Sequence, residues 1–131
     1  MSTAKRTITL KRRVGLTQPI TWKPGGTAQD LTGWAIYMQV REREDSSSPL
    51  LLQISSEGAA PASRIEIDAD QVANAGLLTL YVTAADATSF ASDMGVADIV
   101  AVSPLDQRAL IGRNGWRIVA EEVVTIVEDY P

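Results

Sequence analysis

The chain has 131 residues, of which 45% are hydrophobic and 21% charged, and its formal net charge is −4. This length predicts one domain with a substantial core. The chain contains neither cysteine nor histidine, which excludes disulfides, thiolate and imidazole metal ligands, and Ser-His-Asp or Cys-His catalysis. Carboxylate, lysine or magnesium chemistry, or no chemistry at all, remains open to it.

The charge is unevenly distributed along the chain. The first 23 residues hold six basic and no acidic side chains, whereas the remainder holds six arginines and sixteen acidic residues, a net charge of −10. We interpret residues 1–23 as a basic N-terminal arm on a single domain that spans residues 1–131. The candidate subunit-interface residues in this arm are Lys5, Arg6, Lys11, Arg12 and Arg13.

An edge strand, or a clamp on the acidic surface of a neighbouring copy, is the favoured interpretation of this arm. The acidic body would repel nucleic-acid phosphates, and no aromatic side chain lies between Lys5 and Arg13 to stack on bases. The N-terminus has no continuous apolar stretch, and Asp98 interrupts the longest apolar run. We therefore expect neither nucleic acid nor a membrane as a partner, and we expect synthesis in the cytoplasm.

Apolar and polar residues alternate with a period of two, which predicts strands. The clearest strand carries Trp34, Ile36, Met38 and Val40 on one face. Further strands are predicted at residues 7–11, 18–22, 50–54, 64–67, 77–83, 96–102, 108–111 and 116–127. About nine short strands separated by turns predict an all-β fold, an antiparallel β-sandwich of the Ig-like or jelly-roll kind.

Turn chemistry separates these strands. Residues 23–26 combine a proline with two glycines, and Asn114-Gly115 is the dipeptide favoured in type I′ hairpins. Thr83 is a candidate N-cap for a short helical turn at residues 84–94, with Asp86 in its third position. Residues 68–75 are a second helix candidate, and residues 41–49 are predicted as an exposed hairpin loop or an excursion at the edge of a sheet.

Candidate catalytic and metal sites are few. Glu66, Asp68 and Asp70 would share one face of an extended segment and could attract a divalent cation, but a solvated strand face, with Ile65 and Ile67 pointing inward, is favoured. The adjacent carboxylates of residues 121 and 122 would point to opposite sides of a strand, so they form no acid/base pair. No nucleotide-binding motif is present, so we predict no enzyme, catalytic residue, metal or cofactor.

The strand at residues 34–41 follows Asp30-Leu31-Thr32-Gly33 and ends in Arg41-Glu42. This segment resembles a group of small tailed-bacteriophage virion proteins, similar to the N-terminal domain of upper baseplate proteins. The likeness continues through residues 76–90, 95–111 and 121–125, and so covers about residues 20–130. It implies an Ig-like or jelly-roll sandwich that serves as an attachment module in a virion, without catalytic residues. Upper baseplate proteins continue into long fibre segments, whereas this sequence ends at Pro131, so we expect the docking module alone.

The residues of Asp30-Leu31-Thr32-Gly33 also have a local interpretation. Asp30 and Thr32 can hydrogen-bond nearby backbone amides, and Leu31 can anchor the turn in the core. Gly33 permits the backbone angle needed on entry to the strand. We therefore predict a structural turn at residues 30–33.

Three functions are considered. The first is a non-enzymatic virion structural protein, a multi-copy docking or adaptor module of the tail, baseplate or neck, whose partners are other virion proteins and further copies of itself. The second is a capsid decoration protein that stabilises the head. The third is a carbohydrate-binding module that uses Trp22, Trp34 and Trp116, although core packing of these tryptophans is favoured.

Overall fold

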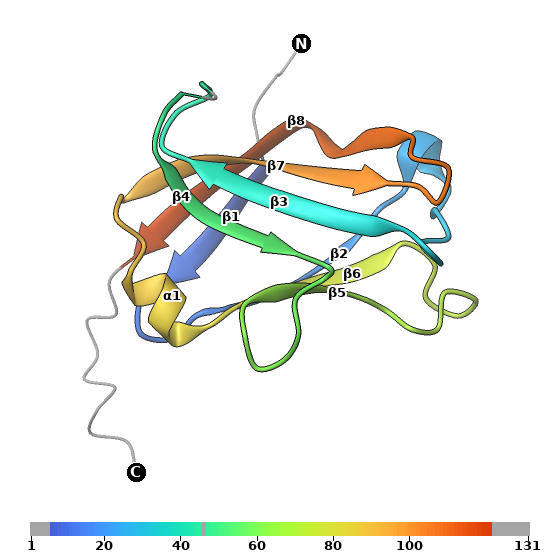
Figure 1. The fold of residues 1–131 in the computed structure, drawn as a ribbon, viewed down its shortest axis with the longest axis horizontal. Coiled ribbons are helices and arrows are strands. Elements are labelled where there is room, and N and C mark those ends of the chain that lie inside the picture. The colour runs from blue at the N-terminus through green and yellow to red at the C-terminus, as the bar shows by residue number, and fades with distance from the viewer. Residues whose placement is uncertain (1–5, 46, 122–131) are drawn as a thin grey trace.

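The structure is a computed structural model, and it describes residues 6–45 and 47–121. Two β-sheets lie face to face, with a short helix at one end (Figure 1). Strands form because apolar and polar residues alternate, so that each strand buries one side. The elements in chain order are β1 (Arg6–Lys11), β2 (Leu16–Thr21), the 3-10 turn η1 (Pro24–Gly26), β3 (Ala35–Arg41), β4 (Leu50–Ser55), β5 (Arg64–Ile67), β6 (Leu77–Val82), α1 (Ala84–Thr88), β7 (Met94–Val102) and β8 (Arg108–Glu121).

The order of the strands is that of an Ig-like sandwich. One sheet has five strands in the order β1-β8-β7-β3-β4, and the other has three in the order β2-β6-β5. All neighbouring strands are antiparallel except β1 and β8, which are parallel. With β2, β6 and β5 as strands B, E and D, and β3, β7 and β8 as strands C, F and G, the grouping is that of immunoglobulin domains. The predicted all-β antiparallel sandwich is confirmed.

The core lies between the two sheets. On β3, Ile36, Met38 and Val40 are buried whereas Tyr37 and Gln39 are exposed, as the period of two predicted. The other strands contribute their own inward residues to the same core, which is why most of the molecule's large apolar side chains are withdrawn from water. These include Ile8, Leu10, Ile20, Ile54, Ile65, Leu78, Leu80, Val82, Ile99, Ile111, Trp116 and Ile118.

The predicted hairpin at Asn114-Gly115 is wrong. Residues 108–121 form one strand, because both of its halves pair with β7 rather than with each other: Ile111 lies opposite Ile99, and Trp116 lies opposite Ala97. The extra residues between these pairs make a bulge. Gly112 has a φ of +83°, and a Cβ atom there would lie 2.6 Å from the Trp116 Nε1 atom. The bulge therefore folds over the buried indole, which donates its N–H to the Ile111 carbonyl at 2.8 Å.

Helix is scarcer than predicted. The helix capped by Thr83 is present but spans only Ala84–Thr88, and the Thr83 hydroxyl accepts a hydrogen bond from the Asp86 N–H. Residues 68–75 form turns instead of the second candidate helix. Their side chains explain this, because short aspartates compete for backbone amides and stabilise turns. The loop predicted at residues 41–49 is the loop of the β3–β4 hairpin and spans residues 42–49, since Arg41 still belongs to β3; residue 46 lies outside the described residues.

The described part of the basic segment belongs to the sandwich and is no separate arm. β1 forms one edge of the five-stranded sheet, and the chain then turns at residues 12–15 to enter β2 in the other sheet. Gly15 makes this crossing possible: its φ is +92°, and a Cβ atom there would lie 2.3 Å from the Val82 carbonyl oxygen. The edge-strand interpretation therefore describes residues 6–11, and the term arm does not apply to residues 6–21.

Candidate functional site

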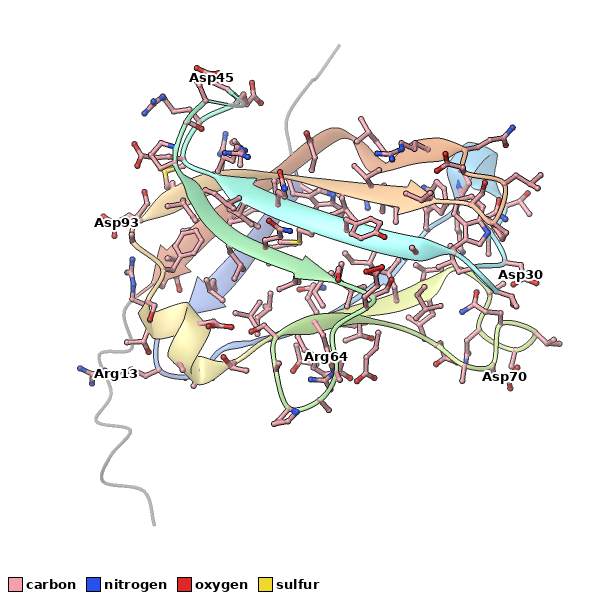
Figure 2. All side chains as sticks on the ribbon, viewed as in Figure 1. Arg13, Asp30, Asp45, Arg64, Asp70 and Asp93 are labelled. Atoms are coloured by element: carbon pink, nitrogen blue, oxygen red, sulfur yellow. The ribbon has the colours of Figure 1, made fainter. Side chains whose placement is uncertain are left out.

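The Asp30-Leu31-Thr32-Gly33 turn lies at one end of the sandwich and leads into β3 (Figure 2). The Asp30 carboxylate accepts hydrogen bonds from the Thr32 N–H at 2.9 Å and from the Thr32 hydroxyl at 2.6 Å. Leu31 is fully buried, and Gly33 has a φ of +78°. Each residue type thus has a local structural role in the turn.

Gln71 joins this turn to a second one, and sequence reasoning missed it. Its side chain is buried, and its Oε1 atom accepts the backbone N–H groups of Leu31 at 2.9 Å and Gly76 at 3.0 Å. Its Nε2 atom donates to the Asp68 carbonyl at 2.8 Å. In the sequence, a polar residue among turn residues is expected to face solvent. Nothing in the sequence therefore indicated that Gln71 is buried and joins the two turns.

At acidic pH, the thermal stability of the protein is expected to show the contribution of the Asp30 hydrogen bonds. The hydrogen bonds from the Thr32 side chain and then from its backbone hold the pKa of Asp30 below its usual 3.8, with burial opposing weakly. Because the folded state prefers the charged carboxylate, this contribution to stability is present above the unfolded-state pKa and is lost as the pH falls through the folded-state value. We expect Asp30→Asn, which cannot titrate, to show a shallower fall in Tm than wild type between about pH 5 and pH 2. Equal slopes in thermal unfolding would contradict this.

Arg12 lies inside the domain instead of facing a partner. Its side chain is only 12% exposed, and its Nη2 atom donates to the carbonyl oxygens of Phe90 at 3.1 Å and Ser92 at 2.8 Å. Its Nη1 atom lies 3.6 Å from the Asp93 carboxylate. The guanidinium therefore ties the β1–β2 turn to the segment between α1 and β7. This corrects the assignment of Arg12 to a subunit interface.

The other candidate interface residues lie along β1 and its turn. Arg6 is exposed and stacks over the Trp116 ring, with 5.7 Å between the guanidinium carbon and the ring centroid. Lys11 lies 3.9 Å from the Glu121 carboxylate, and both side chains are more than half exposed, so the pair contributes little to stability. Arg13 is exposed, and its backbone N–H donates to the Thr88 hydroxyl. Lys5 lies outside the described residues.

The acidic triplet is divided between a strand and a turn. Glu66 lies on β5, with its carboxylate 2.6 Å from the Arg64 Nε atom. Asp68 and Asp70 follow the strand, and their carboxylates accept the backbone N–H groups of Asp70 and Ala73, respectively. Ile65 is buried beneath them. These oxygens serve local turns, and no group of three or more acidic residues placed to hold a metal ion occurs within residues 6–45 and 47–121. Of the adjacent glutamates, Glu121 ends β8, and residue 122 lies outside the described residues.

The tryptophans pack against the core, as the sequence favoured. Trp116 is 5% exposed, and Trp22 and Trp34 are partly buried. The rings of Trp22 and Trp34 meet edge to face, with centroids 5.6 Å apart. Such contacts stabilise the pair by about 0.5–1.5 kcal/mol beyond their burial. The three indoles thus form no row of exposed rings on which a sugar would stack.

An apolar row crosses the outer face of the five-stranded sheet, and the sequence did not reveal it. Tyr37 on β3, Val100 on β7 and Leu110 on β8 lie directly opposite one another in the two strand pairings. Tyr37 is 36% exposed and Leu110 is 49% exposed. The Glu57 carboxylate accepts the Tyr37 hydroxyl at 3.1 Å. This hydrogen bond, with smaller effects of burial and of the Glu57 charge, raises the pKa of Tyr37, and Arg108 opposes it.

Two surface hollows adjoin this apolar row. One, of 490 Å³, is lined by residues of both sheets, among them Trp22, Trp116 and Arg6, and meets the row at Leu110. The other, of 330 Å³, lies beside the β3–β4 loop and includes Gln39 and several charged residues, among them Arg41, Arg43, Asp45 and Asp98. The outer face therefore combines an exposed apolar centre with charged groups beside the β3–β4 loop.

In the comparisons with known proteins, no family model and no curated protein matches this sequence. Within the described part of the chain, no helix is long and apolar enough to cross a membrane.

Proposed function

We propose that this chain is a non-enzymatic structural protein of a bacteriophage virion, a multi-copy docking module of the tail, baseplate or neck that bridges other virion components. The resemblance of residues 30–42 to virion proteins supports this proposal. In the structure these residues form one unit, in which the Asp30–Gly33 turn leads into β3 and β3 lies between β7 and β4 in the five-stranded sheet.

The observation that carries the docking role is the apolar row of Tyr37, Val100 and Leu110. Protein interfaces combine an apolar centre with a polar rim, and contiguous exposed apolar patches mark interaction sites. The row has such a rim, because Arg108 lies two residues before Leu110 and Asp98 lies two residues before Val100. Arg6 and Lys11 add positive charge on β1. With Lys5 and Arg13, they remain our proposed contacts to an acidic neighbour.

Incorporation into particles tests this function. We expect quantitative mass spectrometry of purified virions to find the protein at a fixed, low copy number. A number in the hundreds would favour the capsid decoration alternative, and absence from particles would overturn both. The half-buried, packed positions of Trp22 and Trp34 and the burial of Trp116 count against the carbohydrate-binding alternative.

The apolar row is tested by an exchange of one apolar side chain for a charged one. We expect Leu110→Asp to reduce incorporation into virions by at least about tenfold, because it places a charge among the apolar side chains of the docking surface. Val72→Asp is the matched control, since Val72 is 96% exposed in the turn after β5, outside the row. Both variants should fold, as circular dichroism would check. Equal incorporation of the two variants would contradict docking through this row.

A further inference from the structure

The two sheets end in four edge strands, β1 and β4 in the larger sheet and β2 and β5 in the smaller. Backbone groups on an open edge pair with strands of other chains unless charge, proline or short length prevents it. Three of the edges carry such protection. β1 has Arg6 and Lys11 at its ends, β2 contains Pro19, and β5 has only four residues, including Arg64 and Glu66.

β4 differs from the other three edges. Its sequence, LLLQIS, contains neither a charged residue nor a proline. It lies at the open side of the larger sheet, where Figure 1 shows it next to β3. Leu50 is 46% exposed, and Leu51 and Leu52 are only partly buried. Within the described chain, β4 is thus the edge that lacks these means of preventing strand addition.

The backbone of β4 offers hydrogen-bonding groups on this side. The Ser56 N–H donates to the Ile36 carbonyl on β3, and successive residues of a strand point their backbone groups to alternate sides. Leu52 and Ile54 therefore bond to β3, and Gln53 and Ser55 direct their N–H groups outward. The register shift between β3 and β4 lies at the Leu50–Leu52 end, so the regular part of the edge is centred on Gln53.

We propose that β4 pairs antiparallel with β4 of a second copy of this chain, around a two-fold axis at Gln53. The two larger sheets would then form one continuous sheet across a dimer. The lack of charge on the strand favours a second copy as the partner. An antiparallel two-fold places the axis residue opposite its own equivalent and the two ends of the strand opposite each other, so a strand with charges of one sign would repel its copy. β4 carries no charge, whereas β1 would bring Arg6 near Lys11.

The same pairing also extends the core. With Gln53 opposite Gln53 of the second copy, Leu52 of each chain would lie opposite Ile54 of the other, on the side that faces the core. A symmetric contact of this kind uses one edge from each chain and closes as a dimer, so no unprotected edge remains for further addition. This inference does not depend on the proposed virion function.

Sedimentation velocity of the full chain, from micromolar to near-millimolar concentration, tests the proposal. We expect wild type to form dimers as the concentration rises. Gln53→Lys should weaken dimerisation by at least about tenfold, because two like charges would face each other across the axis. Gln39→Lys is the matched control: Gln39 lies opposite Gln53 on β3, its Nε2 atom is 3.4 Å from the Gln53 Oε1 atom, and it is not on the edge. This variant should dimerise like wild type.

Two further measurements complete the test: the pairing of variants with opposite charges at residue 53, and amide hydrogen exchange of wild type. Gln53→Glu should weaken dimerisation in the same way as Gln53→Lys, and a mixture of the two variants should recover a heterodimer, because opposite charges then meet. In wild type, the Gln53 amide should exchange more slowly with solvent at high concentration than at low concentration, a measurement that needs no variant. A monomeric wild type, an unprotected Gln53 amide, or equal dimerisation of Gln39→Lys and Gln53→Lys would each overturn the proposal.

Discussion

Replacement of Gln71 by alanine is expected to lower the free energy of unfolding by about 3 kcal/mol. The change removes the acceptor of two buried backbone N–H groups, those of Leu31 and Gly76, and the donor to the Asp68 carbonyl. An unsatisfied buried polar group costs about 1–3 kcal/mol, so two orphaned amides account for the expected loss. Urea denaturation should show a lower midpoint with an unchanged m-value.

Val72→Ala is the matched control for this prediction. Val72 follows Gln71 in the same turn, but its side chain is 96% exposed. Its truncation should change stability by less than about 0.5 kcal/mol. If Gln71→Ala lowered the free energy of unfolding by less than about 1 kcal/mol, the prediction would be contradicted, because the two turns would then keep their positions without the Gln71 side-chain amide.

Replacement of Arg12 by alanine is expected to cost about 2 kcal/mol of stability. The guanidinium donates to two backbone carbonyls and lies beside Asp93, in a position only 12% exposed. Hydrogen bonds from charged donors contribute about 1.5–3 kcal/mol. Denaturant unfolding of the isolated chain at low concentration checks the prediction, since no other virion protein is then present and the chain is monomeric.

Two substitutions make the Arg12 test specific. Arg12→Lys keeps the charge but loses the planar fork that reaches two carbonyls, so its stability should lie between those of wild type and Arg12→Ala. Lys11→Ala removes an exposed charge with a weak ion pair and should cost less than about 0.5 kcal/mol. If Arg12→Ala were as stable as wild type, Arg12 would be better explained by a contact to another subunit.

The strands were predictable because each carries its own alternation. On β3 the inward residues Ile36, Met38 and Val40 are buried as expected, and β5 has the predicted bounds. The Asn114-Gly115 hairpin failed for a physical reason: a dipeptide that permits positive φ suits a bulge as well as a turn. The pairing of both halves of β8 with β7 decided between them.

The interaction surfaces were harder to predict from the sequence than the strands. Tyr37, Val100 and Leu110 belong to three strands that are distant in the chain, and only the register of the sheet aligns them. The basic residues before Pro24 looked alike in the sequence. In the structure Arg12 is engaged inside the domain, Arg6 stacks on Trp116 and Lys11 faces solvent.

The sequence by itself determined the all-β class, the inward face of β3, the local hydrogen bonds of the Asp30–Gly33 turn, and the exclusion of cysteine and histidine chemistry. These properties depend on residue type and on spacings of a few residues. The tertiary structure alone decided the roles of Gln71 and Arg12, the apolar row and the unprotected edge at β4. Those depend on which distant segments meet, and strand order and register are set by the packing of the whole core rather than by any one segment.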